Sequence, residues 1–246
     1  MTFVTFEYCL FFNKTNTLNI SNLSFESDKI LSSLPEKDRA YFLSFTQVLH
    51  FKKGKLIFYQ DGIPTGVFLL KSGKAKIYKT GAYGKDQIFY IYKKGDLFGY
   101  HALLCNEDYE ESCEAIEDCE ILFVNKYDFK LLLDKIPQIQ SLIIQNISHE
   151  FGVLVNTITI LAQKNLRERL ALYLVILNER YQKEGCAMTQ IVLPREDLAN
   201  VIGTTRESLG RLLKEFKEDG LIKIDKRAIE VINLKKVQEI ANLQAK

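Results

Sequence analysis

Short apolar runs alternate with glycine-containing breaks from about Lys52 to Val124. The runs are rich in aromatic and β-branched residues, which strands favour, and the glycines between them favour turns. Strands at this even spacing, with no helical period between them, predict an antiparallel β-sandwich or β-barrel. The predicted strands are Lys55–Tyr59, Val67–Leu70, Ala75–Tyr78, Gln87–Tyr92 and Glu120–Val124.

A helical period replaces this pattern after Asn125. Residues 127–135 predict a short helix that ends near Pro137, and residues 139–163 predict a long one. In the long helix, apolar residues recur in steps of three and four and form a seam along one side. The seam consists of Ile144, Ile147, Phe151, Leu154, Ile158 and Leu161.

The long helix also carries a second apolar flank. A helix with two apolar flanks needs two surfaces against which to bury them. The β-domain can cover one flank and a second copy of the chain can cover the other, so we expect a homodimer that packs along the seam. The residues of the second flank are Leu142, Ile143, Val153, Val155 and Ile160.

Two short helices joined by a glycine are predicted further along the chain. Pro194 suits the first turn of the first helix, and Gly203 suits a tight turn with positive φ. Thr204 or Thr205 can cap the second helix through its side-chain oxygen. Two helices joined in this way predict a helix-turn-helix, the fold of many DNA-binding domains.

Two further elements flank this pair of helices. A helix over residues 166–182, closed by Gly185, is predicted before it. Residues 221–232 follow it and predict two strands with a charged turn between them. These two strands would form the wing of a winged helix-turn-helix.

Three charged side chains lie on the predicted outer side of the second short helix: Arg206, Glu207 and Arg211. An arginine can bridge O6 and N7 of guanine, and a glutamate can accept a hydrogen bond from N4 of cytosine. The trio therefore has the chemistry to read a DNA site that contains G·C pairs. A solvated helix face would carry similar charges, but the wing and the long helix favour DNA contact.

Composition and charge agree with this interpretation. The chain is 47% hydrophobic and carries a net charge of +2. Beyond Lys164, 15 basic residues face 12 acidic ones, which suits contact with nucleic acid at one end. No run approaches the roughly 18–20 apolar residues of a membrane span, and the start lacks the features of a signal peptide. We therefore expect a cytoplasmic protein with no membrane partner.

The chain resembles the Crp/Fnr family of transcription regulators over residues 28–240. The motifs that carry the resemblance are Lys94-Gly-Asp-Leu-Phe-Gly, Arg195-Glu-Asp-Leu-Ala and Gly203-Thr-Thr-Arg-Glu-Ser-Leu-Gly-Arg-Leu-Leu. The resemblance implies an α+β fold with an N-terminal antiparallel β-roll, which is a jelly roll like that of cyclic-nucleotide-binding domains. A long dimerisation helix and a C-terminal winged helix-turn-helix would follow.

The resemblance also implies a division of the chain and a set of partners. The expected domains are an N-terminal arm (1–27), an effector-sensing β-roll (28–135), the dimerisation helix (136–164) and the DNA-binding domain (165–246). The expected partners are double-stranded DNA, a second copy of the chain, RNA polymerase and a small-molecule effector.

Residue roles follow from the same resemblance. The family reads a TGTGA-like half-site with an Arg-Glu-x-x-x-Arg trio, which Arg206, Glu207 and Arg211 match. Three further residues match positions that contact phosphates, and such contacts position the protein without specifying sequence. These residues are Arg195, Thr205 and the wing residue Arg227.

The effector site departs from that of members that bind cyclic AMP. Tyr100 replaces the glutamate that holds the ribose, and Glu110 stands where an arginine would hold the phosphate. Leu154 and Val155 replace the Thr-Ser pair that contacts adenine. Because a carboxylate repels a phosphate, we expect weak or no binding of cyclic AMP and an effector of unknown identity. The candidate pocket residues are Gly99, Tyr100, His101, Leu103, Glu111, Ser112, Leu154 and Val155.

Other cofactors of the family find less support, and the cofactor is unknown at this stage. The five cysteines are scattered, and an iron–sulfur cluster would need a closely spaced N-terminal set where this chain has only Cys9 before residue 105. Haem would need an axial ligand, although an isolated histidine is more often an ordinary hydrogen-bonded residue. A switch through Cys113 and Cys119 stays open as well. The candidate haem ligands are His50, His101 and His149.

Two other functions fit parts of the pattern. An enzyme of the cupin type would need a histidine-rich metal set, which the sequence lacks, so we expect neither a catalytic site nor a bound metal. An effector-binding protein that acts through protein contacts alone would have no need of Arg206, Glu207 and Arg211. We therefore interpret the chain as a DNA-binding regulator whose conformational populations respond to an effector in the β-roll.

Overall fold

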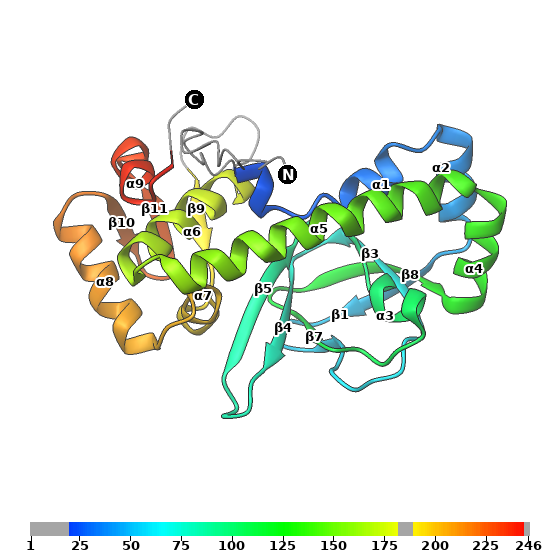
Figure 1. Ribbon diagram of the computed structural model, residues 1–246, viewed down its shortest axis with the longest axis horizontal. Coiled ribbons are helices and arrows are strands. Elements are labelled where there is room, and N and C mark those ends of the chain that lie inside the picture. Colours follow the sequence, from blue (N-terminus) through cyan, green and yellow to red (C-terminus); the bar gives the residue numbers. More distant parts are fainter. Residues whose placement is uncertain (1–19, 182–188, 244–246) are drawn as a thin grey trace, which may run out of the picture.

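The computed structural model describes residues 20–181 and 189–243. The predicted N-terminal arm is therefore described only from Ile20, and Cys9, Gly185 and Cys186 lie outside the described residues. Figure 1 shows a long helix, α5 (Pro137–Gln163), that crosses the molecule. A β-roll lies beneath one half of this helix, and a small unit that is mostly helical surrounds its other end (Figure 1).

The β-roll consists of two four-stranded sheets whose strand pairs are antiparallel, which confirms the predicted fold. One sheet has the order β1 (Gln47–Phe51), β8 (Cys119–Asn125), β3 (Gly66–Ser72) and β6 (Leu97–Phe98). The other has the order β2 (Leu56–Phe58), β7 (Ser112–Ala115), β4 (Ala75–Thr80) and β5 (Asp86–Tyr92).

Aromatic side chains fill the space between the two sheets. The rings of Phe58 and Tyr109 stack with their centroids 4.1 Å apart, and those of Tyr92 and Phe98 stack at 4.5 Å. All four rings are buried, and stacked buried rings stabilise a fold beyond the effect of burial alone. The interior of the roll is thus packed by the chain's own side chains.

Helices close one end of the roll. The first turns of α5 share an apolar cluster with three short helices, to which Ile139 and Ile143 contribute from α5. Asn125 begins the last of the three, because its side-chain oxygen accepts hydrogen bonds from the backbone N–H groups of Tyr127 and Asp128. The three helices are α1 (Asp28–Ser32), α2 (Glu36–Leu43) and α4 (Lys126–Lys135).

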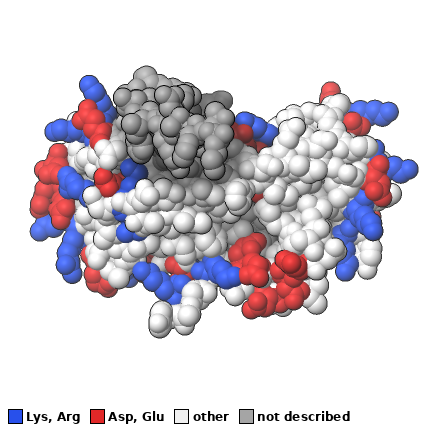
Figure 2. Space-filling view, viewed as in Figure 1, with Lys and Arg blue, Asp and Glu red and all other residues white. Residues whose placement is uncertain are grey.

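The long helix α5 has two different sides, as the sequence predicts. Ile143, Val153 and Ile160 are buried, whereas Ile144, Phe151 and Ile158 are 65%, 70% and 66% exposed. Val155, which we expected on the buried flank, is exposed, because the flank is narrower than the sequence pattern suggests. Figure 2 shows an uncharged band across the middle of the molecule, over α5. Nevertheless, no helix in the described part of the chain is long and apolar enough to cross a membrane.

The C-terminal unit is a winged helix-turn-helix. Its first short helix starts at Arg195, one residue after the expected Pro194, which precedes it as the N-cap. The two predicted wing strands are present, and a third strand and a last helix were not predicted. The elements in order are α6 (Leu166–Tyr181), β9 (Gln190–Val192), α7 (Arg195–Ile202), α8 (Arg206–Glu218), β10 (Ile222–Asp225), β11 (Ala228–Val231) and α9 (Leu234–Ile240).

Residues 20–25, which we call the strap, lie against α5 and α6 at the centre of the molecule. The strap includes the 3-10 helix η1 (Ile20–Leu23). Four consecutive carbonyl groups of the strap each bond a side chain from α5, α6 or β5, so it ties these elements together. The pairs are Asn156 Nδ2 to Asn22 O (3.0 Å), Arg180 Nη2 to Leu23 O (3.0 Å), His149 Nε2 to Ser24 O (2.8 Å) and the Tyr90 hydroxyl to Phe25 O (3.0 Å).

The substitution Phe98→Ala tests the packing of the roll. It removes a fully buried ring from the aromatic interior and should lower the free energy of unfolding by about 3–5 kcal/mol, measured by urea denaturation. Tyr83→Ala removes a fully exposed ring from the turn between β4 and β5 and serves as the control. The control should change the free energy of unfolding by less than about 0.5 kcal/mol. Equal effects of the two substitutions would contradict the packing.

Candidate DNA-binding surface and sensing site

Helices α7 and α8 meet at a turn whose geometry the sequence requires. Gly203 has φ 68° and ψ 50°, a left-handed conformation that suits glycine. Thr205 is the N-cap of α8, because its hydroxyl accepts a hydrogen bond from the backbone N–H of Ser208 at 3.2 Å. Of the two predicted caps, Thr205 is the one that serves. On the inner side of α8, Leu209, Leu213 and Phe216 are buried and hold the helix in place.

The outer side of α8 presents three charged residues near its N-terminal end. Arg206, Glu207 and Arg211 are all exposed. A backbone N–H group and the Thr205 hydroxyl hydrogen-bond Glu207 and lower the pKa of its carboxyl group. Glu207 is therefore ionised at neutral pH and can only accept hydrogen bonds. Two hydrogen-bond donors, Arg206 and Arg211, and one acceptor, Glu207, therefore stand close together on an exposed face of α8.

A basic groove lies beside this face, between α8 and the wing. It also contains Gly210 and three apolar residues that form its floor. No acidic residue lines it, so the groove suits the phosphate backbone of DNA. Its basic residues are Arg195, Arg206, Lys214, Lys217 and Lys226.

Of the three residues expected to contact phosphates, Arg195 lines this groove, Arg227 follows the groove residue Lys226 in the wing turn, and Thr205 lines a separate cleft at the start of α8. Arg195 lines the groove at the start of α7 and donates from Nη1 to the backbone carbonyl of Arg227 at 3.2 Å. This bond joins α7 to the wing turn, where the side chain of Arg227 is exposed. The hydroxyl of Thr205 is engaged in the helix cap, so its own backbone N–H is the other group it can offer.

Buried polar side chains join the roll to α5 at the start of α3 (Tyr100–Cys105). Glu150 projects from α5 and is 3% exposed. Its Oε2 lies 2.6 Å from His101 Nε2, and the Tyr100 hydroxyl donates to its Oε1 at 3.1 Å. Asn146, one turn earlier on α5, donates from Nδ2 to the Tyr100 hydroxyl oxygen at 2.6 Å. A carboxylate of α5 is therefore bound by the segment in which we expected the effector pocket.

The electrostatics of this cluster are dominated by negative charge. Burial by itself lowers the pKa of His101, but the hydrogen bond and charge of Glu150 outweigh it, with help from Glu111, and the pKa is raised. Burial also raises the pKa of Glu111. Two carboxyl groups thus act on one imidazole in the segment where we expected the effector pocket.

The other candidate pocket residues are spread around this cluster. Gly99 has φ 83°, and a Cβ at this position would lie 2.8 Å from the Phe68 ring, so any other residue would strain the backbone and displace this ring. The Ser112 hydroxyl accepts a hydrogen bond from the backbone N–H of Gln60 at 3.0 Å. Leu103 is half-buried on α3.

Two candidate pocket residues lie apart from the rest. Leu154 and Val155 are 37% and 45% exposed on α5, on the side that the roll does not cover. The structure of one chain therefore brings Tyr100 and His101 together with Glu150, and leaves Leu154 and Val155 at the open face of the helix.

Histidine and cysteine side chains are engaged within the chain or lie apart. His101 and His149 each bond a protein oxygen through Nε2, and His50 is exposed on β1. Cys113 and Cys119 are buried free thiols, and burial raises the pKa of both. Within residues 20–181 and 189–243, no group of three His, Cys, Asp or Glu residues could hold a metal ion.

Comparison with known protein families identifies both halves of this architecture. Residues 48–135 match the model of the cyclic nucleotide-binding domain, and residues 168–240 match that of the Crp-like helix-turn-helix domain. The two matches cover about two thirds of the chain and occur in the order in which the roll and the winged helix-turn-helix are arranged here. The chain therefore belongs to the Crp/Fnr family of DNA-binding transcription regulators.

Individual relatives agree with this assignment. The chain is 28% identical over 195 residues to an anaerobic regulatory protein of Aggregatibacter actinomycetemcomitans, a match that covers 77% of this chain and 74% of the relative. It is 26% identical over 208 residues to the cyclic AMP receptor protein of Thermus thermophilus, covering 81% and 90% of the two chains. Among solved structures, FixK2 from Bradyrhizobium japonicum has the same fold, with a TM-score of 0.71, 22% identity and coverage of 82% and 98%.

Glu150 and Asn146 were not expected from the sequence as members of the polar cluster around Tyr100 and His101. A signal was present for Glu150, because it is the only charged residue (Asp, Glu, Lys or Arg) in the 27 residues of α5. A single charge in an apolar helix is costly to bury unless it finds a partner. Asn146 carries no such signal, because several other amides occur along the same helix.

The raised pKa of His101 predicts a pH-dependent contribution to stability. A histidine whose pKa is higher in the folded state stabilises the fold fully below its unfolded value of about 6.5. This contribution is lost as the pH rises through the folded pKa. His101→Gln should therefore lower the free energy of unfolding more at pH 6 than at pH 9, measured by urea denaturation.

Glu150→Gln provides the matched test of the cause. If the charge of Glu150 raises the pKa of His101, this variant should lose the same part of the pH dependence, and the double variant should lose no more. A wild-type difference between pH 6 and pH 9 that persists in both single variants would mean that another group is responsible.

Proposed function

We propose that this protein is a homodimeric transcription regulator that binds a palindromic DNA site with TGTGA-like half-sites. The observation that carries the proposal is the exposed trio of Arg206, Glu207 and Arg211 on the outer side of α8, beside a basic groove. An arginine or glutamate at such a place in the major groove discriminates between base pairs. The groove residues supply the charge that neutralises the backbone.

The proposed roles divide the surface into reading and positioning groups. Arg206 and Arg211 would donate to guanine, and Glu207 would accept from cytosine. Arg195, Thr205 and Arg227 would contact phosphates and set the register of α8 in the groove. Contact through the Thr205 backbone N–H at the start of α8 suits a phosphate, because helix N-termini attract anions.

The exposed face of α5 supports the homodimer. Ile144, Phe151 and Ile158 lie on this face at heptad spacing and are each about two-thirds exposed. Residues of this kind in water favour a partner surface, and a second α5 presents the complementary seam. A two-fold dimer would place its recognition helices on two half-sites about one DNA turn (~34 Å) apart. The full proposed seam is Ile144, Ile147, Phe151, Leu154, Ile158 and Leu161.

The effector is proposed to be something other than cyclic AMP. Glu150 and Glu111 face the cluster around His101, so a cyclic phosphate there would meet negative charge. The chain's own aromatic rings also occupy the space inside the roll. We further propose the division into arm, roll, dimerisation helix and DNA-binding domain given above, action in the cytoplasm and contact with RNA polymerase.

DNA binding is tested by gel shift and fluorescence anisotropy on TGTGA-type palindromes. Arg211→Ala should cost about 1–3 kcal/mol and relax the preference at one base position, because it removes a base contact. Arg227→Ala should weaken binding to all sequences alike and reduce the slope of log affinity against log salt by about one. Wild-type affinity and specificity in both variants would refute this face as the DNA-binding surface.

The dimer is tested by light scattering on Phe151→Glu. A carboxylate in the middle of the seam leaves the monomer intact, because Phe151 is 70% exposed, but it cannot be buried against a second apolar helix. We expect a dimer for the wild type at micromolar concentration and a monomer for the variant. Tyr83→Glu, at an exposed site away from α5, is the control and should stay dimeric.

A further inference from the structure

The outer face of β5 packs against the helix-turn-helix of the same chain. Ile88 and Ile91 belong to the same apolar cluster as Leu198 of α7. Residues three apart on a regular strand face opposite sides of a sheet. The pairing of β5 with β4 shifts by one residue at Phe89, and this bulge lets both isoleucines face α7. The roll is therefore shaped to receive this helix.

A buried ion cluster lies at the same junction. Lys76 on β4 is 7% exposed, and its Nζ lies 2.7 Å from Oδ1 of Asp197, which is 6% exposed in the first turn of α7. Glu114 on β7 lies 3.3 Å from the same Nζ. Burial by itself lowers the pKa of Lys76, but its two carboxylate partners outweigh burial and raise it, so the ammonium group stays charged. A buried pair of this kind requires close alignment of its partners, because either charge left alone is costly.

A second bond holds the other end of α7. Gln87 on β5 donates from Nε2 to the backbone carbonyl of Val201 at 3.3 Å. Asp197 stands in the first turn of α7 and Val201 in the last, so neighbouring strands of the roll hold the helix at both ends. Two points of attachment restrict rotation of the helix as well as its distance from the sheet.

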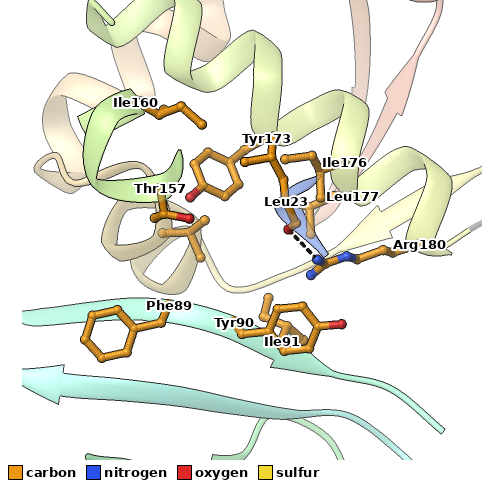
Figure 3. A pocket seen from close by; sticks show the side chains of 11 residues that line it. Leu23, Phe89, Tyr90, Ile91, Thr157, Ile160, Tyr173, Ile176, Leu177 and Arg180 are labelled. Carbon is orange, nitrogen blue, oxygen red and sulfur yellow. Dashed lines mark hydrogen bonds between the residues drawn. The ribbon is translucent and has the colours of Figure 1, made fainter. Parts of the chain in front are cut away.

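The junction is closely packed between β5 and helices α5 and α6, whereas an open cleft of about 490 Å³ lies between the β4–β5 hairpin and the start of α8. Figure 3 shows the cavity between β5 and the helices, with the hydroxyl groups of Tyr173 and Thr157 near its centre. Its volume is about 20 Å³, room for about one water molecule. Arg180 closes one side, with its guanidinium 4.2 Å from the centroid of the Tyr90 ring and a hydrogen bond to the strap at Leu23 (Figure 3).

The docked arrangement leaves the reading face exposed to solvent, and Arg206 and Glu207 also line the cleft that faces the β4–β5 hairpin. Arg206, Glu207 and Arg211 are exposed while α7 is held against the roll, because docking uses α7 and the reading face belongs to α8. We propose that Lys76 is a positioning residue for DNA binding. By holding Asp197, it fixes the direction of α8 relative to α5 and so selects the half-site spacing that the dimer accepts. This inference rests on the proposed function.

The proposal has a quantitative consequence for binding to two half-sites. Linking two binding units raises affinity by roughly 10² to 10⁴ without any new contact, provided that both units can engage at once. Units of fixed direction engage both half-sites at one spacing. If the DNA-binding domains can change direction, the dimer binds palindromes of several spacings, each with a lower affinity. The affinity of one domain for one half-site stays the same.

The test compares wild type with Lys76→Met and Asp197→Asn. Each protein is titrated with a single half-site and with palindromes whose half-sites are separated by the preferred spacing, one base pair less or one base pair more. The preferred spacing is found first with the wild type. We expect both variants to bind the preferred palindrome about tenfold more weakly, because they lose part of the affinity gained by linking two units. Both variants should also discriminate less between spacings. Half-site affinity should stay within about twofold, which also shows that the helix-turn-helix is folded.

Lys71→Met is the matched control. Lys71 forms a surface pair with Glu120 at 2.8 Å on the other sheet of the roll, so this variant removes a lysine ion pair without touching α7. It should behave like wild type at every spacing. If wild type prefers one spacing and both junction variants keep that preference, the inference is wrong and the proposed function stands. A wild type without any spacing preference also refutes the inference, and one that binds no DNA refutes both.

Discussion

Helix α5 has apolar residues on two sides, and the need to bury both sides governs how the rest of the chain is arranged. This helix carries apolar residues around most of its circumference and only one Asp, Glu, Lys or Arg residue, so water is a poor solvent for either side. Ile143, Val153 and Ile160 bury one side against the roll and the helices around it. The other side remains uncovered in the single chain. The roll, the helix-turn-helix and the strap all pack around the covered side, and the roll also contacts the helix-turn-helix directly through Lys76 and Asp197.

Two buried charged clusters fix the relative orientation of elements that apolar packing alone would not orient. Glu150 joins α5 to the start of α3 through His101, and Lys76 joins β4 to α7 through Asp197. Apolar surfaces attract without regard to orientation, whereas a buried ion pair tolerates little displacement. The protein thus has one directional joint between roll and long helix and another between roll and DNA-binding helices. A change in either joint alters how the two halves are aligned.

Local sequence patterns predict most of the fold, but they do not predict the two buried charged clusters that orient its parts. Even spacing of β-rich runs predicts the roll, and the steps of three and four from Ile144 to Leu161 predict the long helix, because each pattern reflects burial within one element. Gly203 and Thr205 predict the helix-turn-helix because φ and capping act over a few residues. Lys76 and Asp197 lie 121 residues apart, and each looks like an ordinary surface charge in its own segment. Strand β9 is missed for a similar reason, since its three residues gain a partner only when the wing folds back on them.

The strap can complete its contacts only late in the synthesis of the chain. Its carbonyl groups bond side chains of His149, Asn156 and Arg180, which lie 125, 134 and 157 residues further along the chain. Ribosomes add about 5–20 residues per second, so the strap emerges at least several seconds before its last partner exists. The roll can close on itself during that interval, whereas the seat of the strap is complete only after α6 has been synthesised. The first described segment of the chain is thus among the last to find its place, and it locks together halves that were made at different times.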